Sequence, residues 1–434
     1  MNKPVDTNSG LSRRGLLTAA GGLAIAAGAI GAGGMAAADR FTRRDQPASP
    51  ASMVEPFYGV HQSGIVTPQQ THSIFATFDL DTSTRADVIT LLKRWTDAAN
   101  RMSRGETAQP LGQPKDAPAL DGGSAAGLAA ARLTITFGFG PGLFTRDGVD
   151  RYGLAARRPE ALVDLPKFNG DQLIAEKSDG DLSIQACADD PQVAFHALRE
   201  LLNLATGIAT IKWVQSGFTS PPPAGGTTRN LMGFKDGTNN PSTHDNDLMS
   251  KMLWVGDEGG WMKAGSYVVV RRIRIALEHW DKTELGFQEE VVGRDKAVGA
   301  PLGKTHETDP LDLDAEDQDG NPVIPATAHS RLSSAAENDG SQILRRAYSF
   351  NDGVGFYAER WPPWRQGMML DAGLFFVAYQ RDPRTGFIRI NKKLASLDIM
   401  NQYTTHVGSG IFACPPGAAE GSFIGAALFE GLTG

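Results

Sequence analysis

One order of secondary structure occurs twice in this chain, and it limits the possible folds more than any other feature. In the first half, the spacing of apolar residues predicts strand, helix, strand, strand, helix and strand at residues 73–80, 84–102, 131–138, 182–188, 190–207 and 208–215. The first helix has a start signal at Thr84 and Asp87, and the second opens at Asp190-Pro191. This βαββαβ order is that of a ferredoxin-like unit.

The same order returns after residues 216–228, a stretch with three consecutive prolines and two glycines that we interpret as a linker. The second set of elements is predicted at residues 265–276, 281–293, 345–350, 374–379, 390–403 and 408–413. We therefore predict an α+β protein with two ferredoxin-like βαββαβ domains and antiparallel sheets, at residues 55–215 and 229–434. The repeat lies in element order only, since the halves show no convincing sequence identity.

The N-terminus has the features of an export signal. Arg13 and Arg14 precede an apolar run rich in Gly and Ala, residues 16–35, and a small-residue site at residues 36–38. A transmembrane anchor is the alternative, but a run of this composition partitions poorly into hydrocarbon. We predict a twin-arginine signal peptide at residues 1–38, a flexible lead at residues 39–54, and a periplasmic or secreted protein.

Composition limits the partners and the ways of attaching a cofactor. The chain has 434 residues and a formal net charge of −7, which argues against nucleic acid as a partner. Its two cysteines, Cys187 and Cys414, lie far apart and form no C-x-x-C pair. This excludes a disulfide framework and the covalent attachment of c-type haem. One disulfide between them remains possible in an oxidising compartment, but we do not expect it.

Three short segments carry residues suited to chemistry at a flat ligand. Residues 233–237 read GFKDG, so Asp236 lies next to a glycine in a tight loop. Downstream, His329 follows the sequence PATA, and Arg345 lies in the strand-like sequence ILRR. Each signal is weak by itself. Acid–glycine turns are common, a single histidine more often has a structural role, and an arginine often forms an ion pair.

Asp236, His329 and Arg345, in that order and with those neighbours, resemble the site of the dye-decolourising peroxidases, a family of haem b enzymes. The match is close to the exported EfeB-like branch, which holds deferrochelatase/peroxidase proteins. Similar segments extend from about residue 55 to the C-terminus, at residues 57–70, 270–274, 299–302 and 377–383. Chance agreement at so many separated places is not expected.

The resemblance implies a haem b in the C-terminal domain, with His329 as the axial ligand of the haem iron. Asp398, in a segment similar to a helix of the family, would orient the other nitrogen of the imidazole. Further residues would line the haem, namely Gly237, Thr238, Asn239, Ser334, Ala335 and Ala336. Leu374, Phe375 and Phe376 would form an apolar wall, with ordinary strand core as an equal alternative. His61 would pack near the haem pocket, and we assign it no chemistry.

Peroxidase chemistry gives roles to the other two residues. Asp236 would be the base that moves one proton from the inner to the outer oxygen of hydrogen peroxide. Arg345 would be the fixed cation that stabilises charge on the departing oxygen. Arg346 is adjacent and points to the other face of a strand. We prefer Arg345 because it matches the Ile-Leu-Arg pattern of the family.

Two functions share this site. The first is a haem b peroxidase that uses hydrogen peroxide to oxidise bulky organic donors such as dyes and porphyrinogens. The alternative is a deferrochelatase that releases iron from haem with the porphyrin ring intact, as part of an iron-uptake system. A non-catalytic haem carrier would not need both Asp236 and Arg345. The family also implies a homodimer or a higher homo-oligomer.

Two further features receive structural interpretations. Residues 307–319 contain seven acidic residues, but a calcium loop would have glycine where Asp317 lies and a glutamate six residues later, which is missing. We therefore predict a solvated acidic loop. His196 lies within a helical pattern, and we expect it at the surface or partly buried.

Overall fold

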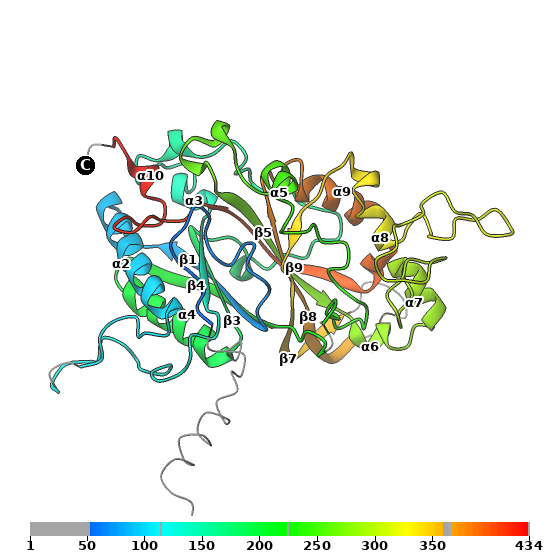
Figure 1. The fold of residues 1–434 in the computed structure, drawn as a ribbon, viewed down its shortest axis with the longest axis horizontal. Helices are drawn as coiled ribbons and strands as arrows, with labels where there is room; N and C mark the ends of the chain where they lie inside the picture. Colours follow the sequence, from blue (N-terminus) through cyan, green and yellow to red (C-terminus); the bar gives the residue numbers. More distant parts are fainter. Residues whose placement is uncertain (1–52, 113–114, 224, 359–363, 365, 433–434) are drawn as a thin grey trace, which may run out of the picture. The chain divides into compact units, whose positions relative to one another are not determined.

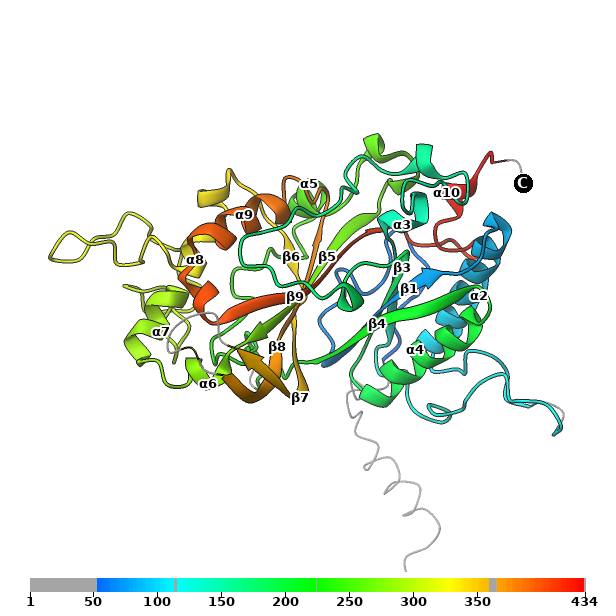
Figure 2. The same cartoon turned by 180° about the vertical axis from the view of Figure 1, so that it is seen from behind.

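Within the described residues, nine strands join into one antiparallel sheet that the two halves of the chain share (Figures 1 and 2). This computed structural model describes residues 53–112, 115–223, 225–358, 364 and 366–432. The twin-arginine signal and most of the lead lie outside the described residues, so these interpretations stay predictions. In the part of the chain that is described, no helix has the length and apolarity needed to cross a membrane.

The first half follows the predicted element order closely. Its main elements are β1 (His72–Leu80), α2 (Arg85–Ser103), β2 (Thr134–Phe139), β3 (Leu182–Ala188), α4 (Pro191–Ala205) and β4 (Ala209–Phe218). Short helical turns lie between β2 and β3, namely α3 (Pro141–Phe144), η2 (Ala155–Arg157) and η3 (Ala175–Lys177). Both long helices begin with the expected caps: Thr84 accepts from the amide of Asp87, and Asp190 accepts from those of Gln192 and Val193. The strand order is β4-β1-β3-β2.

The second half repeats this strand arrangement with more insertions. Its strands are β5 (Ser266–Ile275), β6 (Leu344–Arg345), β7 (Tyr348–Ala358), β8 (Gln366–Gln380) and β9 (Thr404–Cys414). Its helical elements are α5 (Asn246–Met252), η4 (Asp257–Met262), α6 (Leu277–Trp280), α7 (Leu285–Val292), α8 (His329–Leu332), η5 (Ala336–Asn338), α9 (Phe387–Leu397), η6 (Ile399–Gln402) and α10 (Ala426–Phe429). The long strands pair in the order β9-β5-β8-β7.

Pairing between the halves closes this sheet into a ring. β2 meets β9 at Phe139 and Ala413, while β4 meets β7 at Phe218 and Ser349. β5 pairs with both β8 and β9, which completes the circuit. The strands of the two halves therefore pair at two junctions, and each junction rests on a single pair of residues. Mixed helices and antiparallel strands confirm the α+β class.

Several predicted element boundaries were wrong. Ala131 and Arg132 have φ near 51° and 52°, a left-handed conformation that cannot continue a strand, so β2 begins only at Thr134. The strand predicted at residues 345–350 is divided between β6 and β7. The helix predicted at residues 390–403 ends at Leu397, where Asp398 turns its side chain to cap η6. β4 runs on to Phe218, which shortens the linker.

The inner face of the ring is filled by apolar side chains from both halves. Phe75 of β1 lies 5.4 Å from Phe375 of β8 and 5.9 Å from Phe412 of β9, measured between ring centroids. All three are nearly inaccessible to solvent. Phe375 therefore belongs to the ordinary strand core, which was the alternative to a place in the apolar wall of the haem site. Its neighbours Leu374 and Phe376 point to the other face, because successive side chains of a strand alternate.

The outer faces of the two halves are covered differently. In the first half, α2 and α4 pack directly on the sheet, and Trp95 of α2 lies 5.2 Å from Phe78 of β1. In the second half, α8 and α9 lie beside the strands (Figure 1). Residues of both helices and of β5, β8 and β9, including Leu374 and Phe376, line a cavity. The second half thus keeps open a space that helices fill in the first.

We predict that Phe375→Ala lowers the free energy of unfolding by about 3–5 kcal/mol, because it leaves a hole in a close-packed core. Phe376→Ala is the matched control one residue away, and it should cost clearly less because that ring borders the cavity. Urea denaturation followed by tryptophan fluorescence measures both. Equal losses for the two variants would contradict the assignment of faces.

Candidate functional site

The cavity lies against the outer face of the second half of the sheet. Its floor is formed by residues of three strands, including Ile273 of β5, Leu374 and Phe376 of β8, and His406 of β9. The opposite wall comes from α8, α9 and the loop that carries Asp236. The sequence elements that place chemistry here are far apart in the chain, and the sheet brings them together.

His329 begins α8 and faces the cavity, where 35% of its side chain is exposed. Its Nδ1 lies 2.6 Å from Oδ2 of Asp398, and the other carboxylate oxygen of Asp398 accepts from the amide of Met400 at 2.8 Å. Burial lowers the pKa of His329, but the Asp398 carboxylate raises it and dominates, so the net shift is upward. A neutral ring that donates from Nδ1 leaves Nε2 as a free electron-pair donor.

A second histidine, His406, lines the cavity but lacks this property. Arg271 donates from Nε to Nδ1 of His406 at 2.9 Å. The neutral ring must then carry its proton on Nε2, which removes the lone pair that a metal needs. Burial, and next to it the Arg271 cation, holds the pKa of His406 well below its ordinary value. The hydrogen-bond network therefore singles out His329 of these two.

Asp236 and Arg345 form an ion pair in the same cavity. Arg345 donates from Nη1 to Oδ1 of Asp236 at 2.7 Å, and Asn230 donates to Oδ2 at 3.3 Å. Both members keep some exposure, 27% for the arginine side chain and 18% for the aspartate. The pair is therefore open to a small ligand that enters the cavity.

The main chain of Arg345 is fixed by a residue that sequence reasoning missed. Asn240 donates to the carbonyl of Arg345 at 2.7 Å and accepts from its amide at 2.9 Å. Arg346 points the opposite way, as strand alternation predicts. It is buried and donates to Gln70 at 2.8 Å and to the carbonyl of Thr67. Of the two arginines, only Arg345 lines the cavity.

The loop after Asp236 lies along one edge of the cavity. Gly237 has φ of 118°, a conformation that residues with a Cβ rarely adopt. Thr238 donates to Glu307 at 2.8 Å, and Lys235 pairs with the same carboxylate. Burial raises the pKa of Glu307, but its hydrogen bonds, first from Lys235, outweigh this and lower it. Glu307 of the acidic stretch thus ties this loop to the segment before His329.

Some of the residues predicted to line the haem border the cavity, and others do not. Gly237, Thr238, Asn239, Ala335, Leu374 and Phe376 line the cavity, and Ser334 and Ala336 do not. His61 is also elsewhere: its ring stacks on Trp254 at 3.6 Å and its Nδ1 lies 2.7 Å from the carbonyl of Ala264. The expectation that His61 packs near the pocket is therefore wrong.

The residues present fit a haem. Apolar side chains of the sheet and of α9 suit the faces of a porphyrin, and His329 offers the nitrogen donor that haem iron takes. Neither cysteine borders the cavity, and both are free and buried. A haem here would therefore be held without thioether bonds.

Arg294 also lines the cavity. Burial, and to a lesser extent the nearby Arg345, lowers the pKa of Arg294, although Glu307 raises it.

Comparison with known proteins agrees with this geometry. The sequence matches the family description "Dyp-type peroxidase, N-terminal" over residues 62–219 and "Dyp-type peroxidase, C-terminal" over residues 227–419. The chain belongs to the Dyp-type peroxidase family. The resemblance to dye-decolourising peroxidases is thereby confirmed, and this Dyp-type peroxidase is a haem-binding enzyme.

Individual relatives are similar over nearly their whole length. Deferrochelatase of Escherichia coli (strain K12) is 36% identical over 432 residues, which cover 96% of this chain and 97% of that protein. A DyP-type peroxidase from Streptomyces coelicolor is 40% identical with a TM-score of 0.79, covering 88% of this chain and 99% of that one. Ferric DtpA from Streptomyces lividans has the same identity, TM-score and coverage.

Proposed function

We propose that this Dyp-type peroxidase binds one haem b in its C-terminal half, with Nε2 of His329 as the axial ligand of the iron. The observation that carries the proposal is the hydrogen bond between Nδ1 of His329 and Asp398, which leaves Nε2 directed to ligand binding. The absence of a C-x-x-C-H sequence favours haem b over covalently attached haem. The bound haem would supply the iron at which hydrogen peroxide is reduced.

Asp236 and Arg345 would handle protons and charge on the peroxide. Asp236 is held by Arg345 and Asn230, so its carboxylate has a defined direction in which to accept a proton and return it. Arg345 offers a rigid guanidinium, and its main chain is fixed by Asn240. A positioned cation of this kind stabilises charge that develops on a departing oxygen without first reorganising.

The strand order supports a ferredoxin-like assignment for each half. The order β4-β1-β3-β2 in the first half and β9-β5-β8-β7 in the second are the same once strands are counted from the start of each half. Each half also has a helix after its first and after its third long strand. We interpret the halves as two ferredoxin-like units, of which the second holds the haem.

The donor would be a bulky organic molecule such as a dye or a porphyrinogen. Release of iron from haem with an intact porphyrin ring is the second candidate, because relatives named deferrochelatase are 36% identical over 96% of this chain. Incubating the protein with haem, with and without peroxide, separates the two. Bleaching of a dye that requires peroxide supports the peroxidase, and metal-free protoporphyrin formed without peroxide supports iron release.

Export by the twin-arginine route and self-association complete the proposal. Arg13 and Arg14 support export to the periplasm or beyond. The β7–β8 hairpin exposes Val354, Phe356 and Met368 by 62%, 71% and 66%, which supports a homo-oligomer that covers them. Export is checked with Arg13→Lys/Arg14→Lys, which should leave precursor in the cytoplasm, and oligomer size by light scattering. Normal export of this variant would refute the twin-arginine route. A monomer in light scattering would refute self-association.

We expect His329→Ala to lose most of its haem, because among the described residues that line the cavity the only other histidine, His406, has its unprotonated nitrogen engaged by Arg271. Haem content per chain and the position of the Soret band measure this. His406→Gln is the control at the other cavity histidine and should keep its haem. A His329→Ala protein with full haem content and an unchanged Soret band would contradict the assignment.

We expect Asp236→Asn and Arg345→Leu both to slow the reaction with peroxide while haem is retained. Loss of a general base costs about 10²–10⁴-fold, and loss of one fixed charge-stabilising donor about 10²–10³-fold. Water can partly replace the carboxylate, and Arg345→Leu also leaves Asp236 without its partner. Arg345→Leu should therefore slow the reaction at least as much. Stopped-flow mixing with peroxide, followed at the Soret band, gives the rates; parental rates in both variants would refute the roles.

A further inference from the structure

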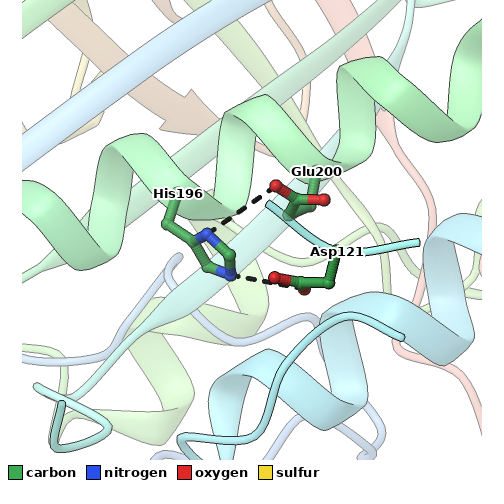
Figure 3. A group of neighbouring side chains, drawn as sticks. All are labelled: Asp121, His196 and Glu200. Carbon is green, nitrogen blue, oxygen red and sulfur yellow. Dashed lines mark ion pairs between the residues drawn. The ribbon is translucent and has the colours of Figure 1, made fainter. Parts of the chain in front are cut away.

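A buried cluster in the first half, remote from the cavity, holds a histidine and two carboxylates. His196 and Glu200 lie one turn apart on α4, and Asp121 comes from the long connection between α2 and β2 (Figure 3). The three residues are only 3%, 1% and 1% exposed. The prediction that His196 lies at the surface or partly buried was therefore wrong. Bulk water therefore has almost no access to the two carboxylates.

The imidazole of His196 has one nitrogen satisfied and one not. Its Nδ1 lies 2.9 Å from Oγ of Ser124, and a proton on this nitrogen can be donated to that hydroxyl. Nε2 is buried and has no hydrogen-bond partner among the described residues. It faces Oδ2 of Asp121 at 3.5 Å, which is long for a hydrogen bond (Figure 3). With the proton on Nδ1, the lone pair of Nε2 faces a carboxylate oxygen, which is repulsive unless a proton or a metal ion lies between them.

The carboxylates are held in place by main-chain amides rather than by cations. Asp121 accepts from the amides of Ala108 at 2.7 Å and Gly123 at 2.6 Å. Glu200 accepts from the amide of Gly122 at 3.1 Å. The guanidinium of Arg199 lies close to Gly122, but it forms no ion pair with either carboxylate in the described part of the chain. Buried carboxylates that lack a paired cation are costly, and a bound metal ion is one way to compensate them.

We propose that Asp121, His196 and Glu200 bind a divalent transition metal ion of the Zn²⁺ type. One imidazole nitrogen and carboxylate oxygens are ligands that zinc takes at about 2.0–2.2 Å. Two such atoms 3.5 Å apart subtend about 113° at a shared ion, close to the tetrahedral angle. One donor atom from each of the three residues lies within 4.8 Å of the others. Two ligands of one ion at about 2.1 Å lie at most about 4.2 Å apart, so the carboxylate of Glu200, now 3.8 Å from Nδ1 of His196, must move toward Nε2 to complete the set. Water would supply the fourth ligand.

The ion would fasten a long connection to a helix. Residues 104–133 link α2 to β2 without a helix or strand among those that are described. Long connections of this kind cost entropy when they are ordered, and they are uncommon inside a compact unit. A metal held jointly by Asp121 and by α4 closes this connection near its middle. The site is structural in this proposal and separate from haem binding.

The test uses the full mature, haem-loaded protein without a polyhistidine tag, stripped with a chelator. Titration with Zn²⁺ by calorimetry should show one ion per chain, and Zn²⁺ should raise the temperature of unfolding. His196→Gln, Asp121→Asn and Glu200→Gln should each weaken binding at least about tenfold, since even residues that only orient ligands cost 10–100-fold when changed. Each variant should lose the thermal shift and keep its Soret band.

His306→Gln is the matched control, because His306 is 79% exposed beside Asp309 in the acidic loop and could bind zinc adventitiously. It should bind as the parent does. The proposal is overturned if the parent protein binds no Zn²⁺. It is also overturned if all three cluster variants bind Zn²⁺ as tightly as the parent while His306→Gln loses binding. Asp121→Asn keeps the size of the side chain, so the test holds even if His196→Gln does not fold.

Discussion

The hydrogen bond between His329 and Asp398 is the contact on which the proposed function depends. It lies at the meeting point of two short elements, since His329 opens α8 and Asp398 stands between α9 and η6. The carboxylate can serve the imidazole only because α9 stops at Leu397 and the chain turns there. The same side chain caps η6 with its other oxygen, so the residue that follows the end of α9 also holds the imidazole of His329. A single carboxylate thus fixes which nitrogen of His329 is free.

The rest of the fold keeps a cavity open above that nitrogen. Both halves use the same strand order, and their inner faces meet in a shared apolar core around Phe75 and Phe375. The first half then covers its outer face with α2 and α4, whereas the second half holds its helices away from β5, β8 and β9. The Asp236 loop and Arg345 come to the edge of this space from different parts of the chain. Their ion pair and the double hydrogen bond of Asn240 fix their orientation.

Much of this arrangement could be predicted from the sequence. Hydrophobic pattern and capping signals place α2, α4 and the long strands, because burial of apolar side chains decides those segments. Motif resemblance singled out Asp236, His329 and Arg345, and strand alternation correctly separated Arg345 from Arg346. In contrast, the break between β6 and β7 and the end of α9 depend on tertiary contacts that no local pattern encodes.

The residues that sequence reasoning missed act through partners distant in the chain. Asn240 bonds to Arg345, Glu307 to Thr238, and Arg271 to His406. An isolated Asn or Glu in a loop gives no signal of such a role. His196 was misjudged for the same reason, because its burial comes from a connection that carries no periodic pattern. Polar contacts between loops decide these sites, and they are visible only in the folded chain.

The central claim is that haem lies between His329 on one side and the Asp236–Arg345 pair on the other. A crystal structure of the haem-loaded protein tests it most directly. We predict iron about 2.0–2.1 Å from Nε2 of His329, as expected for a metal–imidazole bond, with Asp236 and Arg345 over the opposite face of the porphyrin. Iron bound to another residue, or a haem with Asp236 and Arg345 on the same face as His329, would contradict the account.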